Sequence, residues 1–186
     1  YKRQLSRLGE PIKVIKKMKQ TDNFKFDEAN VMNELVYRNL SEDEKRQICA
    51  WKYGGEYDLY NLPSYEEMQV RQIGFMNPKS EKNYYGFWDE SILVGFVNIL
   101  EEKEEVFIGI GVNPDLCNKH YGQRMLLITY EISKKLYPDK PLYLEVRTWN
   151  IRAVKCYQKA GFRIDGQAYE LTTGIGTGTF YRMIRE

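Results

Sequence analysis

Residues 106–147 constrain the fold more than any other part of the chain, because they follow the pattern strand, long helix, strand. Residues 106–112 and 142–147 are apolar-rich and β-prone, and residues 121–136 are the longest helical stretch in the sequence. A strand–helix–strand connection within one sheet is almost always a right-handed crossover between parallel strands. The sequence therefore predicts an α/β fold with at least one parallel strand pair.

The remaining patterns place antiparallel strands and short helices around this unit. Two capping boxes, Ser41–Glu44 and Ser64–Glu67, each predict the start of a helix, because their side chains satisfy the first backbone N–H groups. Short polar breaks favour an antiparallel meander before the long helix. The expected strands cover 34–40, 84–89, 92–100, 106–112, 142–146, 162–169 and 177–183, and a last helix covers 151–160. We therefore expect a mixed sheet with helices packed on it.

Charge divides the chain into two parts. Residues 1–20 contain seven Lys or Arg and one Glu, so they carry a net charge of +6, although the whole chain carries only +2. The rest is mildly acidic, which argues against a nucleic-acid-binding domain, because such a domain carries its basic surface on the folded part. We expect a basic N-terminal extension over residues 1–33 and one folded domain over residues 34–186.

Composition limits the chemistry and the cellular setting. No apolar run approaches the roughly 20 residues that a membrane helix needs, and no signal-peptide pattern opens the sequence. The three cysteines, Cys49, Cys117 and Cys156, are odd in number and widely spaced, so we expect a protein of the reducing cytoplasm without a disulfide framework. The single histidine, His120, leaves no set of residues for a catalytic triad or for a metal centre.

The loop from Asn113 to Gly122 leads from a strand into the long helix. A helix N-terminus presents unpaired N–H groups and the positive end of the helix dipole, which suits an anion such as a pyrophosphate. Lys119 adds positive charge, and Gly122 allows close approach of a ligand to the backbone. This loop is a candidate anion site.

A second group of residues makes the assignment specific. The sequence from Leu142 to Phe162 runs from a strand through an Asn-x-Arg-Ala start into a short helix that ends in Gly-Phe. This pattern resembles the second signature of the GNAT superfamily of acyl-CoA-dependent N-acyltransferases. The residues that match in type and spacing are Asn150, Arg152, Ala153, Tyr157, Gly161 and Phe162. The order of elements is similar as well, so the resemblance covers about residues 34–186.

The resemblance implies the GNAT fold, a central mixed sheet splayed between its fourth and fifth strands with helices on both faces, and acetyl-CoA as cosubstrate. It implies a pyrophosphate loop over Asn118, Lys119, His120, Tyr121 and Gly122, pantetheine contacts to the backbone of Ile110, Gly111 and Val112, and a coenzyme contact at Asn150. Two positions depart from the family pattern, Cys117 in place of Gln or Arg and His120 in place of a glycine. Gly109 and Gly111 further suggest a β-bulge where the pantetheine approaches.

The resemblance also implies the catalytic residues. Tyr157 corresponds to the general acid that protonates the departing thiolate, and Glu145 to a general base that removes a proton from the incoming amine. From the residues alone, Tyr157 could instead be a core tyrosine. Glu145 could instead pair with Arg147, which points to the same side of the strand.

The acceptor site is less defined. Glu56, Tyr57 and Asp58 belong to an aromatic and acidic loop that walls the acceptor site in this family, where carboxylates and rings suit a cationic amine. The acceptor could be a small-molecule amine, for which we expect a closed acidic pocket, or a protein N-terminus, for which we expect an open groove. A homodimer is possible. The alternative to an enzyme is a non-catalytic acyl-CoA-binding module that acts as a sensor or interaction domain.

Overall fold

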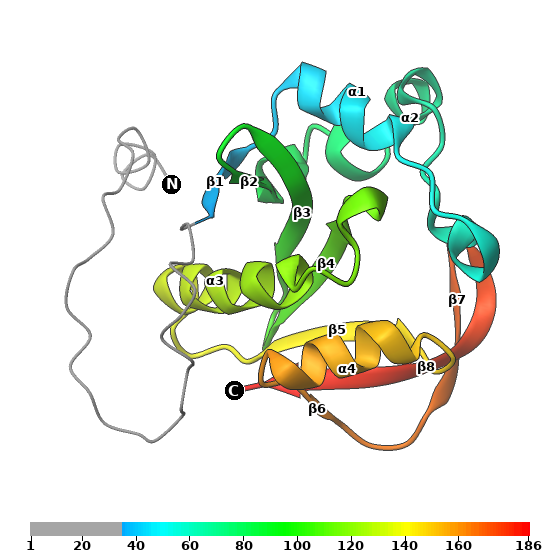
Figure 1. Cartoon of the computed structure of the whole chain (residues 1–186). Helices are drawn as coiled ribbons and strands as arrows, with labels where there is room; N and C mark the ends of the chain where they lie inside the picture. Colours follow the sequence, from blue (N-terminus) through cyan, green and yellow to red (C-terminus); the bar gives the residue numbers. More distant parts are fainter. Residues whose placement is uncertain (1–34) are drawn as a thin grey trace. The chain divides into compact units, whose positions relative to one another are not determined.

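The computed structural model describes residues 35–186, so the predicted basic extension lies outside the described residues. Eight strands form one sheet in the order β1-β2-β3-β4-β5-β8-β6, with β7 paired to β8. All pairs are antiparallel except β4–β5, which is parallel (Figure 1). The strands are β1 (Val36–Asn39), β2 (Tyr84–Asp89), β3 (Ile92–Glu101), β4 (Val106–Val112), β5 (Leu142–Arg147), β6 (Arg163–Ile164), β7 (Tyr169–Thr173) and β8 (Gly176–Arg185).

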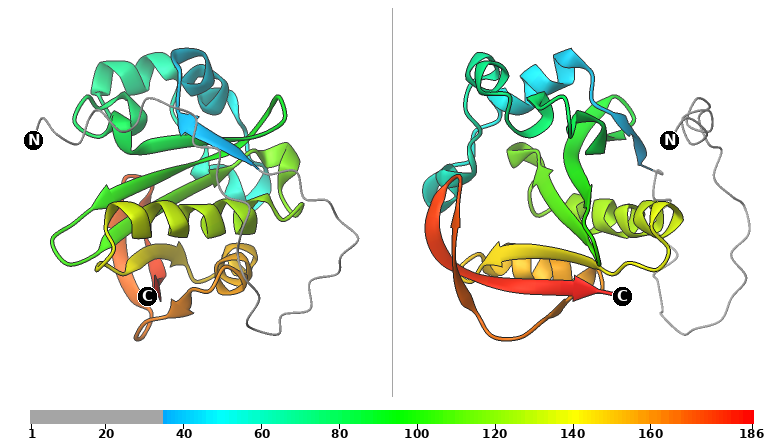
Figure 2. Two further views of the ribbon diagram at one scale, coloured as in Figure 1. Left: turned by 90° about the vertical axis from the view of Figure 1, so that its left-hand side faces the viewer. Right: turned by 180° about the vertical axis from the view of Figure 1, so that it is seen from behind.

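Helices cover both faces of the sheet, as expected. The α-helices are α1 (Glu42–Ala50), α2 (Tyr65–Arg71), α3 (Tyr121–Leu136) and α4 (Ile151–Lys159), and the 3₁₀ turns are η1 (Gly55–Tyr60), η2 (Gly74–Met76), η3 (Glu81–Asn83) and η4 (Pro114–Leu116). Both predicted caps are present. Ser41 and Glu44 form a complete capping box, and the Ser64 hydroxyl accepts from the backbone N–H of Glu67. Figure 2 shows α1 and α2 on one side of the sheet and α3 on the other.

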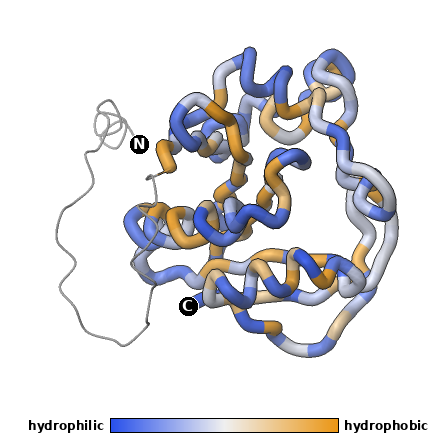
Figure 3. The backbone as a smooth tube through the Cα atoms, viewed as in Figure 1, coloured by the Kyte–Doolittle hydropathy of each residue, from blue (hydrophilic) through white to orange (hydrophobic). Residues whose placement is uncertain are grey.

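Two hydrophobic cores follow from this layering. The larger core joins α3 and α4 to the central strands, with Met125, Leu126 and Leu144 almost fully buried. The smaller core lies between α1, α2 and β2–β3 around Ile48 and Phe75. Figure 3 shows the hydrophobic residues along the central strands and alternating with polar ones along the helices, which is the pattern of elements buried on one face.

The prediction of one strand over 162–169 is wrong. The chain forms a two-residue strand β6, leaves the sheet at Asp165–Ala168, and returns as β7, which makes a hairpin with β8. Gly166 has a φ of 79°, a left-handed conformation that interrupts the extended backbone. An alternating pattern cannot show such a break, because the residues on either side still look like strand residues.

The predicted bulge at Gly109 and Gly111 is also absent. The β3–β4 register is continuous from Gly95–Val112 to Glu101–Val106. Gly111 instead lies under the ring of Phe96, which a Cβ at this position would overlap. Side-chain packing across the strand pair is the reason that a glycine fits here.

Candidate active site

The parallel strands β4 and β5 separate soon after they meet. They pair only through Val106–Leu142 and Phe107–Tyr143, and beyond these residues β4 continues to Val112 and β5 to Arg147 without further pairing. The backbone groups on the two facing edges therefore have no partner in the neighbouring strand, although such groups need one when water is excluded. The space between the two strands is part of a pocket of about 590 Å³, which residues of both β4 and β5 line.

One end of the pocket is the start of α3. Asn118 and His120 have φ values of 65° and 63°, so both adopt the left-handed conformation, and the loop turns sharply into the helix. His120 occupies the N-cap position and makes no side-chain capping hydrogen bond, which leaves the first N–H groups of α3 available to a ligand. Asn118, His120, Tyr121 and Gly122 line the pocket, whereas Lys119 is not among its lining residues.

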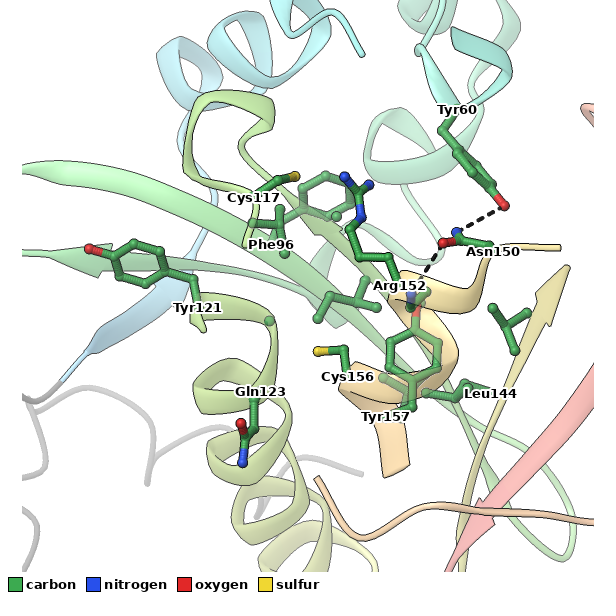
Figure 4. A pocket seen from close by; sticks show the side chains of 18 of the residues that line it. Tyr60, Phe96, Cys117, Tyr121, Gln123, Leu144, Asn150, Arg152, Cys156 and Tyr157 are labelled. Carbon is green, nitrogen blue, oxygen red and sulfur yellow. Dashed lines mark hydrogen bonds between the residues drawn. The ribbon is translucent and has the colours of Figure 1, made fainter. Parts of the chain in front are cut away.

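Two residues of this loop make close contacts with neighbouring elements. The Tyr121 hydroxyl donates to Asp89 at 2.8 Å, so its ring points away from the opening and its backbone N–H is the group offered to a ligand (Figure 4). A Cβ at Gly122 would lie 3.1 Å from the Cys156 sulfur. The glycine thus permits close packing of α3 against α4.

Asn150 holds the start of α4. Its Oδ1 accepts from the backbone N–H of Ala153 at 3.1 Å, and its Nδ2 donates to the Tyr60 hydroxyl at 3.3 Å. The side chain is buried and belongs to the pocket wall. Asn150 therefore acts as an N-cap, as the sequence predicts, and also connects α4 to η1.

Tyr157 lies one turn beyond Ala153 on α4 and lines the pocket beside Leu144 and Cys156 (Figure 4). Burial raises the pKa of its hydroxyl above the ordinary value for tyrosine, and the neighbouring Cys156 thiol contributes to the shift. No residue of the described part of the chain forms a hydrogen bond with this hydroxyl. The group is therefore protonated at neutral pH and faces the opening.

Glu145 reaches the pocket from β5. Its Oε1 accepts a hydrogen bond of 2.6 Å from the Tyr169 hydroxyl, which comes from β7. Burial and this contact raise the pKa of the Tyr169 hydroxyl. The alternative ion pair between Glu145 and Arg147 does not form, because Arg147 donates to backbone carbonyls of the β7–β8 hairpin instead.

The predicted acceptor residues lie outside the pocket. Glu56, Tyr57 and Asp58 belong to η1, where the two carboxylates are solvent-exposed. The Tyr57 ring contacts the Trp149 ring at 5.7 Å and the Arg152 guanidinium at 4.0 Å. None of the three predicted residues is part of the pocket lining.

Sequence reasoning missed an aromatic wall. Six rings from five separate segments line the pocket: Trp51, Tyr53, Tyr60, Phe96, Phe107 and Phe180. The sequence around η1 is visibly rich in tyrosine, but a single turn carries no periodicity that tells which ring points inward. The residues from β3, β4 and β8 give no local signal, since only the folded sheet brings them together.

Together, a helix N-terminus, two diverging parallel strands and a buried tyrosine define the fold of an acyl-CoA-dependent N-acyltransferase. The sequence profile described as "Acetyltransferase (GNAT) family" matches residues 45–162, and the chain belongs to this family. Its members are acyltransferases, so the protein is an enzyme of this class. Comparison with curated protein sequences finds no significant match.

Solved structures show the same fold at low sequence identity. A GNAT-family acetyltransferase from Bacillus anthracis has a TM-score of 0.67 and 17% identity, over 82% of this chain and 94% of that one. Spermidine N-acetyltransferase from Vibrio cholerae, in complex with CoA and spermine, has a TM-score of 0.66 and 18% identity, over 82% and 95%. AAC(6′)-Ib in complex with ribostamycin and coenzyme A has a TM-score of 0.62 and 16% identity, over 80% and 92%.

Within residues 35–186, no helix is both long and apolar enough to cross a bilayer.

Proposed function

We propose that this protein transfers the acetyl group of acetyl-CoA directly to a primary amine within a ternary complex, and that residues 34–186 carry this activity. The observation that carries the proposal is the early separation of β4 and β5, which opens one continuous pocket from the start of α3 to Glu145 and Tyr157. The fold's relatives support an amine as acceptor, since one is a spermidine N-acetyltransferase and another an aminoglycoside acetyltransferase.

The coenzyme would occupy the half of the pocket between α3 and α4. The N–H groups at residues 118–122 would hold the pyrophosphate, Lys119 would add positive charge, and His120 would add a ring N–H donor. The unpaired edge of β4, at Ile110, Gly111 and Val112, would hydrogen-bond to the pantetheine arm. The arm would lie along this edge in the way that an added strand does. Four further basic or polar side chains of α3 and α4 line the pocket: Gln123, Arg152, Lys155 and Lys159.

Two side chains would move the protons. Glu145, directly or through a water molecule, accepts a proton from the ammonium so that the nitrogen lone pair can attack the thioester carbonyl. Its Oε2 forms no hydrogen bond within residues 35–186, so this oxygen is free to accept one from the amine or from a water molecule. Backbone N–H groups near Ile110–Val112 stabilise the developing oxyanion. Tyr157 donates its proton to the departing thiolate as the carbon–sulfur bond breaks.

The test is an acetyl-CoA assay that reads free thiol across a panel of small amines and N-terminal peptides. An enzyme releases thiol in proportion to added amine. A non-catalytic binding module would bind acetyl-CoA in calorimetry without releasing thiol for any amine, and this result would contradict the proposal. Peptide turnover without small-amine turnover would identify a protein N-terminus as the acceptor.

A further inference from the structure

Arg147 is a buried cation in the wall of the pocket. It is 7% exposed, and no carboxylate of residues 35–186 forms an ion pair with it. A buried charge without a counter-charge is costly, because its hydration is lost and only partly replaced. Such groups in a cleft are candidates for binding a ligand of opposite charge.

The fold holds this guanidinium in one place. Nη1 donates to the Thr177 carbonyl at 3.3 Å, and Nη2 donates to the carbonyls of Ile175 and Gly176 at 3.4 and 3.1 Å. The ring of Phe180 lies 5.0 Å from the guanidinium carbon. Gly178 has no Cβ, and one placed there would overlap Nη1, so the hairpin closes tightly around the charged group.

These contacts leave the site incomplete. The three carbonyls are neutral dipoles and do not cancel a full positive charge. The Nε of Arg147 is buried and has no hydrogen-bond partner among the described residues. A guanidinium has five N–H donors in a planar fork that matches a carboxylate. The guanidinium therefore lacks a counter-charge among the described residues.

The charges of the pocket favour the same conclusion. Glu145 is the only carboxylate among the lining residues of the described chain, and on the acceptor side it is accompanied by Arg147. The two residues are i and i+2 on one face of β5, about 6.6 Å apart along the strand. One acidic and one basic group at this spacing suit a ligand with both an amine and an acidic group. A polyamine would instead bring positive charge against Arg147, which is unfavourable.

We propose that the acceptor is an amino acid or a similar amine that carries a carboxylate, with its carboxylate bound by Arg147 and its amine directed to Glu145. This inference rests on the proposed N-acetyltransferase activity and narrows it to one class of acceptor. Arg147 is thus a specificity-determining residue for the reaction.

The experiment compares matched acceptors on the wild-type enzyme. Free amino acids are each assayed beside their primary amides, with spermidine as a polycationic amine. A charge-assisted contact predicts that kcat/KM for the best amino acid exceeds that for its amide about 10- to 100-fold, mainly through KM. The amine of the amide is a weaker base than that of the amino acid, so more of the amide is unprotonated and reactive at neutral pH. This difference by itself would raise kcat/KM for the amide, so it cannot explain a preference for the amino acid. Equal use of the amide, or preference for spermidine, would overturn the inference and leave the proposed function standing.

Variants then assign the preference to one side chain. Arg147→Gln should reduce the ratio of acid to amide to about 1, and Arg147→Lys should retain part of it, because the charge remains without the planar fork. Arg163→Gln is the matched control: it removes a surface arginine paired with Glu186, outside the pocket, and should leave the ratio unchanged. An undiminished ratio in Arg147→Gln would overturn the assignment. If no amine in the panel supported thiol release, both the proposed function and this inference would be contradicted.

Discussion

The hydroxyl of Tyr53 donates a hydrogen bond of 2.6 Å to the carbonyl of Val112 and so ties the segment after α1 to the last residue of β4. Both residues line the pocket. The bond fixes the tyrosine ring in the pocket wall, and it satisfies a carbonyl at the end of the strand edge that we assign to the pantetheine. Burial raises the pKa of this hydroxyl to about 12.

Removing this hydroxyl should destabilise the fold at neutral pH but not at high pH. We expect Tyr53→Phe to lose about 1 kcal/mol or somewhat more at pH 7, because the Val112 carbonyl is left without its partner. In the unfolded wild-type chain the hydroxyl ionises near pH 10, whereas in the folded chain it ionises near pH 12. Wild-type stability should therefore fall as the pH rises from 10 to 12, and the variant should lack this part of the decline. Urea unfolding at a series of pH values measures the difference, and parallel curves would contradict it.

Replacing the proposed acid should slow turnover without weakening coenzyme binding. Tyr157→Phe keeps the ring that packs against the core and removes only the hydroxyl, so kcat should fall at least tenfold while the acetyl-CoA Kd changes little. Because burial raises the pKa of this hydroxyl, its ionisation should not limit the wild-type rate below about pH 10. Steady-state kinetics and calorimetry provide the two readouts. Near-wild-type turnover in Tyr157→Phe would exclude the acid role.

Replacing the proposed base should change the pH–rate profile. Glu145→Gln preserves the shape of the side chain and its acceptor oxygen for Tyr169, but it cannot take up a proton. We expect kcat/KM to fall and the acid limb of the profile to shift. Tyr169→Phe serves as the control, because it keeps the carboxylate and should retain an acid limb. An acid limb that does not move in Glu145→Gln would remove this residue as the base.

The two glycines of β4 should respond differently to the same substitution. A Cβ at Gly111 would overlap the Phe96 ring, so Gly111→Ala should destabilise the protein by about 1–3 kcal/mol. At Gly109 the nearest atom to a new Cβ is the Asn98 Cβ at 3.6 Å, an ordinary contact, so Gly109→Ala should be neutral or slightly stabilising. Denaturant unfolding of both variants tests the comparison. Adding Phe96→Leu to Gly111→Ala should recover part of the lost unfolding free energy. If it recovers none, overlap with the Phe96 ring is not the cause of the loss.

The left-handed conformation of His120 gives a test of the α3 loop. A non-glycine residue at a φ of 63° is strained by about 1 kcal/mol, so His120→Gly should be more stable than His120→Ala by about that amount. Both variants lose the imidazole, so a difference between their acetyl-CoA affinities reports the loop geometry and not the side chain. Thermal unfolding and calorimetry measure the two effects. Equal stability of the two variants would contradict the strain at this position.

Local signals in the sequence determined most of the elements and the family. The capping residues Ser41, Ser64 and Asn150 marked three helix starts, since an N-cap acts within its own turn. The alternation of strand and long helix over 106–147 determined the parallel pair, and the Asn150 to Phe162 pattern determined the family. The positive φ of Asn118 is also a property that the residue type favours.

Only the tertiary structure decided which side chains line the pocket. Arg147 is an ordinary strand arginine in the sequence, and its burial depends on a hairpin 30 residues away whose carbonyls accept its hydrogen bonds. Glu56 and Asp58 are the acidic residues that the sequence favours, yet they are exposed, while Tyr53 and Tyr60 of the same segment line the pocket. The reason is physical: helix caps and strand alternation are set by neighbours in the chain, whereas a pocket wall is set by contacts between distant segments, which no local pattern encodes.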